Sequence, residues 1–162
     1  MSVCIIYPSG KLGDLIWHVP FFKIISNKYS KKVTLIVPSS TQAKDLLRNE
    51  TYLKEVVYND FKKGFINYWQ EILFLRKQLN NKKIIDVWIL DKTSRPAIAV
   101  FFSSAKSVFG YGTGAQRIFL TNKKFLSKQD LKTHYISRGK KFLKIMGLNK
   151  TYEEPFINIK EE

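Results

Sequence analysis

The sequence predicts an α/β protein of the Rossmann-like, doubly wound class, with a mainly parallel sheet and helices on both faces. Three observations favour this class. Short β-branched apolar runs alternate along the chain with helix-like segments, which is typical of βαβ units. One of these runs, 84–91 (IIDVWILD), is almost continuously apolar, as in a strand covered on both faces. The length of 162 residues suits one domain, and right-handed connections then give the doubly wound arrangement.

Strands and helices are expected to alternate almost to the end of the chain. The strands are short runs rich in β-branched residues, and we expect them at 2–7, 32–38, 53–60, 84–91 and 106–111. The helices lie between and after them, and we expect them at 14–28, 40–48, 66–80, 94–103 and 129–146. The tail 151–162 is expected to be a terminal strand or the start of a linker.

The first elements are bounded by clear local signals. The first strand ends at a Pro-Ser-Gly turn, 8–10, and a helix begins at about Asp14. Pro20 lies within two turns of that start, which predicts a kink or a short non-helical beginning. The helix at 40–48 opens with Ser and Thr, which are candidate N-caps.

Two later helices are expected to bury one apolar stripe each. In the helix at 66–80 the stripe consists of Ile66, Trp69, Ile72, Leu73 and Leu79. In the long helix at 129–146 it consists of Leu131, Tyr135, Phe142 and Met146. We also expect both Trp69 and Trp88 in the core.

Composition excludes several classes of protein. Hydrophobic residues make up 44% of the chain and aromatic ones 14%, which suits a packed core rather than a disordered basic tail. No apolar run reaches the ~18–20 residues of a membrane-spanning helix, and the first residues lack the basic leader of a signal peptide. The single cysteine, Cys4, excludes an internal disulfide, and its apolar neighbours predict a buried structural thiol. We therefore expect a cytoplasmic protein.

The chain is strongly basic, with 28 Lys and Arg against 13 Asp and Glu and a formal net charge of +15. Such a charge indicates a polyanionic partner, which can be nucleic acid, an anionic membrane face or a phosphorylated substrate. Most of the cations are lysines in scattered pairs, a pattern that compositional drift in an AT-rich genome also produces. The charge alone therefore selects no partner.

The loop after the first strand, PSGKLGD at 8–14, is the most specific local feature. In open parallel sheets, ligands bind at the carboxyl ends of the strands, above the first βα turn. The spacing of Gly10 and Gly13 matches neither the dinucleotide fingerprint nor a Walker loop. In a structural interpretation, Asp14 caps the helix and complements its dipole. In a catalytic one, Asp14 is a general base for a substrate hydroxyl, and Lys11 holds an anionic group nearby.

The segment 10–60 resembles the N-terminal half of the heptosyltransferases, the family-9 glycosyltransferases that build the inner core of lipopolysaccharide. In that family a loop of the form S-x-x-G-D follows the first strand, and the helix after it contains a proline. The residues that fit this register are Gly10, Gly13, Asp14 and Pro20. The segment 86–121 looks like a later part of the family, and 134–148 (HYISRGKKFLKIMGL) resembles its H-x-x-x-R helix. The resemblance covers essentially all of the chain.

Members of that family have two Rossmann-like domains that face each other across a cleft, so the resemblance implies one half of this GT-B architecture. Residues 1–150 would form the N-terminal acceptor-binding domain, and 151–162 the start of an interdomain linker or a terminal strand. By the same resemblance, we expect the C-terminal, donor-binding domain to be absent from this chain. We therefore expect that the chain alone transfers no sugar.

The resemblance also implies the reaction and its residues. An inverting, metal-independent transferase would pass heptose or a related sugar from a nucleotide sugar to a phosphorylated, lipid-linked inner-core acceptor. The donor, typically ADP-heptose, would bind the second domain, and no other cofactor is implied. Asp14 would deprotonate the acceptor hydroxyl. The expected acceptor-binding residues are Ser9, Gly10, Lys11, Gly13, Lys62, Lys92, Arg95 and Arg117. Of these cations, Arg95 and Arg117 fit best, because guanidinium groups bind oxyanions in a bidentate manner.

Two other interpretations stay open. The first is a basic module that binds nucleic acid or an anionic surface without catalysis, supported by the charge and by mixtures such as DFKKGFINYW at 60–69. No recognised nucleic-acid motif is present, so we expect no specific nucleic acid. The second is a structural relative in which Asp14 is only a cap. For the transferase, the basic surface predicts peripheral association with the anionic inner membrane.

Overall fold

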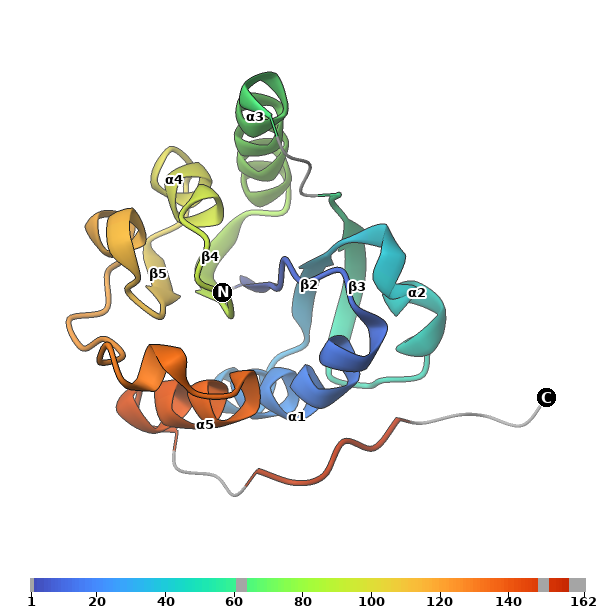
Figure 1. The fold of residues 1–162 in the computed structure, drawn as a ribbon. Helices are drawn as coiled ribbons and strands as arrows, with labels where there is room; N and C mark the ends of the chain where they lie inside the picture. The colour runs from blue at the N-terminus through green and yellow to red at the C-terminus, as the bar shows by residue number, and fades with distance from the viewer. Residues whose placement is uncertain (1, 61–63, 149–151, 158–162) are drawn as a thin grey trace.

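A five-stranded, all-parallel sheet forms the centre of the molecule (Figure 1), in the order β3-β2-β1-β4-β5. The computed structural model describes residues 2–60, 64–148 and 152–157. The strands are β1 (Ser2–Ile6), β2 (Val33–Val37), β3 (Leu53–Tyr58), β4 (Ile84–Ile89) and β5 (Ser107–Gly110). The sequence order reverses between β1 and β4, which makes this point the topological switch of a doubly wound sheet.

Helices cover both faces of the sheet (Figure 1). The α-helices are α1 (Leu12–Tyr29), α2 (Ala43–Leu46), α3 (Phe65–Asn81), α4 (Arg95–Phe101) and α5 (Tyr135–Ile145). Three short 3-10 helices complete the set: η1 (Ser39–Thr41), η2 (Gly114–Phe119) and η3 (Asp130–Lys132). One face carries α1 and α5, and the other carries α3 and α4. The predicted fold class is therefore confirmed.

Alternation along the strands divides the apolar core into two clusters. In β1, Val3 and Ile5 belong to the cluster beneath α1 and α5, whereas Cys4 and Ile6 belong to the one beneath α3 and α4. Cys4 is fully buried, as expected, and this burial raises the pKa of its thiol far above the usual range. Trp88, in β4, is also fully buried.

Helix α1 begins earlier than predicted, at Leu12, and continues through Pro20, which lies inside it. The predicted non-helical start is therefore wrong. The N-cap residue is Lys11, whose side chain makes no capping hydrogen bond, so Asp14 is not the cap. Asp14 lies in the first turn, where its charge complements the positive end of the helix dipole.

The helix expected at 40–48 is reduced to η1 followed by the single turn of α2. Its Ser/Thr capping signal is wrong, because the cap of α2 is Gln42 in a left-handed conformation (φ 51°). Thr41 instead donates its hydroxyl hydrogen bond to the Pro38 carbonyl, 2.6 Å away. This local side-chain bond favours a turn over a continuous helix.

The apolar stripe predicted for the helix at 66–80 is only partly buried. Ile72 and Leu79 lie in the core, but Ile66, Trp69 and Leu73 are 71%, 48% and 60% exposed. The prediction that Trp69 belongs to the core is therefore wrong.

The long helix predicted at 129–146 divides into η3 and α5, because Thr133 is extended and His134 caps α5 by accepting a hydrogen bond from the Ile136 N–H. In the tail, residues 152–157 have no regular secondary structure. None of the helices in the described part of the chain has both the length and the apolarity needed to cross a membrane.

Candidate functional site

The carboxyl ends of β1 and β4, at the switch point, border a polar cavity with a volume of about 280 Å³. Its lining comes from the loop after β1, from α3 and from the segment between β4 and α4. The lining residues are Pro8, Ser9, Glu71, Asp91, Thr93 and Arg95. We call this cavity, together with Asp14, the switch-point site.

Asp14 joins the cavity through Ser9, whose hydroxyl donates a 3.2 Å hydrogen bond to the Asp14 Oδ2. The short loop between β1 and α1 places both residues at the carboxyl edge of the sheet. Asp14 is half-buried. Burial and the nearby Asp14 carboxylate both raise the pKa of the Tyr135 hydroxyl. Tyr135, at the start of α5, therefore also belongs to the surroundings of Asp14.

His18 supports the turn that carries Asp14. Its Nδ1 lies 2.7 Å from the Asp14 backbone oxygen, and since a carbonyl only accepts, Nδ1 carries the proton. The ring packs between Tyr7, at a centroid distance of 4.2 Å, and Tyr135, at 5.4 Å. Burial lowers the pKa of His18 to about 4, so the imidazole is neutral at pH 7. His18 is a positioning residue rather than a charged ligand.

An ion pair lies in the wall of the cavity. The Arg95 Nη1 donates a 2.8 Å hydrogen bond to the Glu71 Oε2, and Glu71 is only 5% exposed. The other carboxylate oxygen, Oε1, is buried and has no hydrogen-bond partner in the described part of the chain. Burial raises the pKa of Glu71, and Arg95 opposes this shift. The pair orients the guanidinium at the cavity.

Asp91, two residues after the end of β4, provides a further carboxylate. Its Oδ1 accepts a 2.8 Å hydrogen bond from the Thr93 backbone N–H, and burial raises its pKa above the usual range. The positive charge of Arg138, on α5, opposes that shift. The site thus combines carboxylates with an arginine on a rigid sheet edge, which suits proton transfer and the binding of hydroxyl groups and oxyanions.

The structure brings only some of the predicted site residues together. Ser9 and Arg95 line the cavity, and Asp14 contacts Ser9. Gly10, Lys11 and Gly13 are exposed on the same loop and first turn.

Of the other predicted cations, Lys92 follows Asp91 in the chain, and the Asp91 carboxylate opposes the lowering of the Lys92 pKa by burial and by Arg138. The Lys92 ammonium donates to the Leu131 backbone oxygen. The Arg117 Cζ lies 4.4 Å from the centroid of the Phe125 ring, in a cation–π contact on η2. Neither of these two contacts involves Asp14 or a residue that lines the cavity. Lys62 lies outside the described residues.

Sequence reasoning missed five members or neighbours of the site: His18, Glu71, Asp91, Thr93 and Tyr135. The sequence did contain a signal for Glu71. It is the single acidic residue on the face of the helix that also carries Leu75 and Leu79, and an acidic residue on an apolar face indicates a buried ion pair or a site. His18 and Tyr135 offered none, since each is defined by contacts between α1 and α5.

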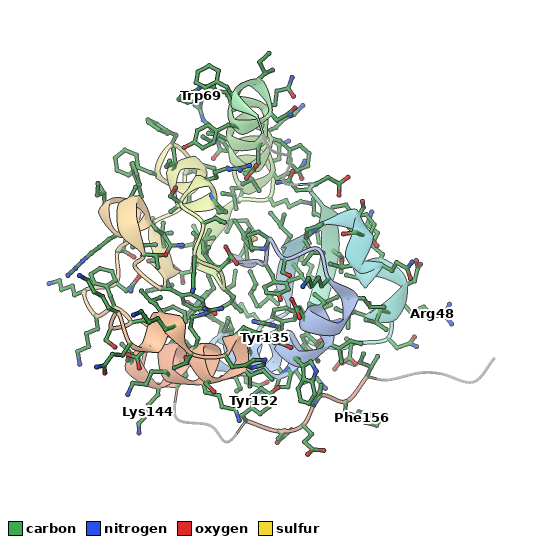
Figure 2. All side chains as sticks on the ribbon, viewed as in Figure 1. Arg48, Trp69, Tyr135, Lys144, Tyr152 and Phe156 are labelled. Atoms are coloured by element: carbon green, nitrogen blue, oxygen red, sulfur yellow. The ribbon has the colours of Figure 1, made fainter. Side chains whose placement is uncertain are left out.

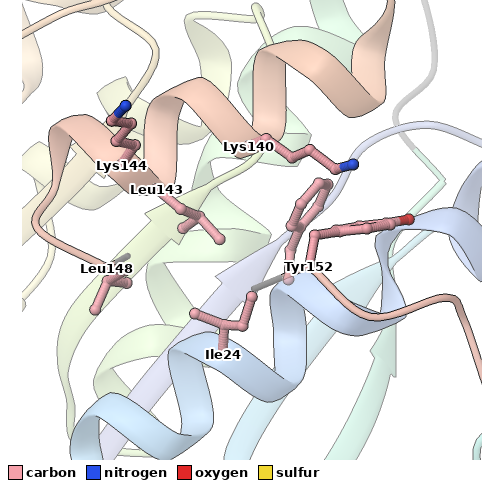
Figure 3. Close-up of a pocket in the computed structure, with 7 residues that line it drawn as sticks. Ile24, Lys140, Leu143, Lys144, Leu148 and Tyr152 are labelled. Atoms are coloured by element: carbon pink, nitrogen blue, oxygen red, sulfur yellow. The ribbon is translucent and has the colours of Figure 1, made fainter. Parts of the chain in front are cut away.

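A second pocket, of about 420 Å³, lies between α1, α5 and the tail (Figure 3). Its wall is mostly apolar, and its charged lining residues are Lys140 and Lys144. It therefore offers no carboxylate for proton transfer. Among residues 2–60, 64–148 and 152–157, no group of three His, Cys, Asp or Glu side chains could hold a metal ion.

Comparison by sequence finds no matching protein-family model and no matching curated protein. Comparison by structure does find relatives. A glycosyl transferase of family 9 from Veillonella parvula superposes with a TM-score of 0.78 at 20% identity, over 99% of this chain and 45% of that one. The E. coli ADP-heptose LPS heptosyltransferase II superposes with a TM-score of 0.67 at 15% identity, over 99% and 47%. The E. coli heptosyltransferase WaaC with ADP superposes with a TM-score of 0.62 at 18% identity, over 96% of this chain and 48% of that one.

The chain therefore has a glycosyltransferase-like α/β fold. More specifically, it has the fold of part of a family-9, heptosyltransferase-like protein, as the sequence resemblance predicted. It spans about half the length of these solved structures. The identities, between 15% and 20%, show the fold, and the activity has to be argued from the site.

Proposed function

We propose that this chain is the acceptor-binding part of an inverting, metal-independent glycosyltransferase that transfers heptose or a related sugar to an inner-core acceptor of lipopolysaccharide. The observation that carries the proposal is the position of Asp14. It is a carboxylate in the first turn after β1, at the switch point of the sheet, and Ser9 connects it to a polar cavity. Ligands of doubly wound folds bind at this point.

In the proposed reaction, Asp14 accepts the proton of an acceptor hydroxyl while the hydroxyl oxygen attacks the anomeric carbon of the donor. The bond from that carbon to the nucleotide phosphate breaks, and its electron pair leaves with the nucleotide. Attack from the side opposite the leaving group inverts the anomeric centre. The neutral His18 and the Ser9 hydroxyl hold the backbone and carboxylate of Asp14 in place.

Arg95 is the proposed contact for the phosphates or carboxylates of the acceptor. A guanidinium has five N–H donors in a planar fork, which matches the geometry of such groups. The Glu71 carboxylate fixes the orientation of that fork at the cavity wall. Binding energy from this remote contact would position the hydroxyl near Asp14.

The proposed reaction also needs a donor and an acceptor. The nucleotide sugar, ADP-heptose by analogy with the E. coli relatives, would bind a second domain that completes the cleft. The phosphorylated, lipid-linked acceptor would be met at the cytoplasmic face of the inner membrane, where a basic protein is attracted peripherally.

Titration with a soluble, phosphorylated inner-core oligosaccharide tests acceptor binding. We expect saturable binding that survives physiological salt. The Arg95→Lys variant should weaken it by about tenfold, because a lysine keeps the charge but loses the bidentate fork. The matched control is Arg48→Lys, an exposed arginine beside α2 and far from α3 (Figure 2). Equal weakening by both variants, or no saturable binding, would overturn the proposal.

A further inference from the structure

Helix α3 presents a row of large apolar side chains to solvent. Phe65, Ile66, Trp69 and Leu73 are 79%, 71%, 48% and 60% exposed. They follow one another at helical spacing, and the rings of Phe65 and Trp69 meet edge to face at a centroid distance of 6.4 Å. Figure 2 shows Trp69 on the outer side of α3, away from the sheet. We call these four residues the α3 ridge.

The ridge is not a packing surface for the sheet, because the opposite side of α3 already fills that role. Ile72, Leu75 and Leu79 of the same helix lie in the core. An ordinary surface helix would carry polar residues on its outer face. Adjacent exposed aromatic and aliphatic groups of this size mark an interaction site on a folded protein.

Charge limits the kind of partner that fits. Arg76 and Lys77 are exposed on the turn that follows the ridge. Glu71 is the only acidic residue of α3, and it is buried in the ion pair with Arg95. The surface is thus apolar and cationic without an exposed acid on the helix. A second copy of the chain would bring a further net charge of +15 against it, which opposes self-association.

We propose that the α3 ridge is a membrane-docking surface that inserts into the interfacial region of an anionic bilayer. Tryptophan and phenylalanine suit the boundary between headgroups and acyl chains, and nearby cations are attracted to anionic lipid. The combination of exposed rings with Arg76 and Lys77 on one helix provides both interactions at once. This inference depends on the surface of α3 and not on the proposed transfer reaction.

The ridge lies close to the switch-point site. Helix α3 follows β3, so its first turns begin at the carboxyl edge of the parallel sheet, where the cavity opens. The ring of Tyr68, beside Trp69 in the sequence, lies 5.6 Å from the Arg95 Cζ. A bilayer in contact with the ridge would therefore lie beside the cavity. The exposed Phe101 and Phe102 end α4 at the opposite edge of the sheet and are not part of the ridge.

Vesicle flotation tests the proposal with the full chain. The vesicles contain phosphatidylcholine alone or phosphatidylcholine with phosphatidylglycerol, and they carry no saccharide acceptor. We expect binding to the anionic vesicles at physiological salt. The double substitution Ile66→Ser with Trp69→Ser should reduce the bound fraction by about tenfold or more. Both side chains are exposed, and an unchanged thermal melt will confirm that the variant is folded.

The matched control is Phe156→Ser, because Phe156 is a 67% exposed aromatic residue on the opposite side of the molecule (Figure 2). Its backbone oxygen accepts a hydrogen bond from the Lys23 ammonium, on α1. The control should bind anionic vesicles like the unaltered chain. Equal loss in the control and the ridge variant would overturn the proposal. A different result would also overturn it: the unaltered chain self-associates and binds neither kind of vesicle, and the ridge variant is monomeric.

Tryptophan fluorescence provides a direct readout of insertion. The chain has three tryptophans, of which Trp88 is fully buried and Trp17 is 41% exposed. In a Trp17→Phe variant, Trp69 is the exposed tryptophan that remains. We expect its emission to shift to the blue with anionic vesicles and to be quenched by brominated lipid. Binding without quenching would mean that charge alone holds the protein at the surface, which would overturn insertion of the ridge.

Discussion

At the scale of single residues, Asp14 has two roles: its charge complements the dipole of α1, and we propose that it is the general base. One substitution separates the two roles. Asp14→Asn keeps the size of the side chain and an oxygen that can accept from Ser9, but it removes the base. In the proposed transferase, sugar transfer measured with a donor-binding domain joined to this chain should fall by ~10²–10⁴-fold. The free energy of unfolding should change by about 1 kcal/mol or less, the cost of losing a charge at a helix N-terminus. Transfer rates and thermal unfolding measure the two effects.

Together, the transfer rate and the stability of this variant distinguish the two roles of Asp14. A normal transfer rate with reduced stability would mean that the carboxylate serves only the helix dipole. A matched control is Asp45→Asn, which removes an exposed acidic residue from the first turn of α2. This control should leave the transfer rate unchanged.

His18 predicts a dependence of stability on pH. Its pKa is about 4 in the folded chain and about 6.5 in the unfolded one, so the unfolded state binds the proton first as the pH falls. The stabilisation is present above pH 6.5 and is lost between 6.5 and 4, by about 3 kcal/mol in total. His18→Asn keeps a donor for the Asp14 carbonyl but has no such titration. Urea unfolding across this range should show the loss in the unaltered chain only.

Glu71 and Asp91 also contribute to the pH dependence of stability, which is why the comparison needs the variant. The raised pKa values of Glu71 and Asp91 act in the opposite direction, since their protonation in the folded state stabilises it as the pH falls. They are present in both proteins, so the difference between the two pH profiles isolates His18. Parallel profiles would contradict the assigned burial of the imidazole.

At the scale of elements, the contact between α1 and α5 depends on a close approach at Gly139. A Cβ atom at this position would lie 2.4 Å from the ring of Phe21, which is only 1% exposed. Gly139→Ala should therefore lower the free energy of unfolding by about 1–3 kcal/mol, despite the higher helix propensity of alanine. The control is Gly13→Ala, where no atom lies within 4 Å and alanine should stabilise α1 by up to ~1 kcal/mol. Thermal or urea unfolding of both variants measures the contrast.

The strands could be predicted because they are short runs rich in β-branched apolar residues, and Trp88 was placed correctly because its run, 84–91, is almost continuously apolar. It mispredicted the buried face of α3 because apolar residues occur on both sides of that helix. The face in the core includes Glu71, which is tolerated there because Arg95 from α4 pairs with it. Hydrophobic periodicity cannot reveal a partner from another helix.

The candidate site, like the fold, could be predicted only in part from the sequence. Asp14 and Ser9 could be found because they lie in the first helical turn and the loop that follow the first strand, and the edge of a parallel sheet is a general location for ligands. Tyr135 and Glu71 come from helices far along the chain, and only tertiary packing brings them to this edge. The division of the helix predicted at 129–146 has a local cause, since Thr133 and His134 bond to nearby backbone groups instead of continuing it.

At the scale of the whole molecule, the net charge of +15 is spread over both layers and not gathered in one groove. Exposed cations occur on each side of the sheet and at its amino-terminal edge, for example Arg76 on α3, Lys140 on α5 and Lys31 before β2. A nucleic-acid site would concentrate them along one face or one helix. The distribution therefore favours attraction to anionic surfaces in general over recognition of a particular duplex.

This distribution predicts how the chain binds random duplex DNA. Binding at low salt should weaken by about 10³-fold or more between roughly 50 and 200 mM salt, because contacts of lysines with phosphates release counterions. Oligosaccharide binding should persist over the same range of salt. It depends on Arg95, which is held in place by the buried Glu71, and salt screens such a partly buried group less than it screens exposed lysines. Arg48→Lys and Arg95→Lys should leave DNA binding unchanged, since both retain the charge. If DNA binding instead survives physiological salt and the oligosaccharide fails to bind, the basic surface is a nucleic-acid site and the transferase fold has lost its acceptor.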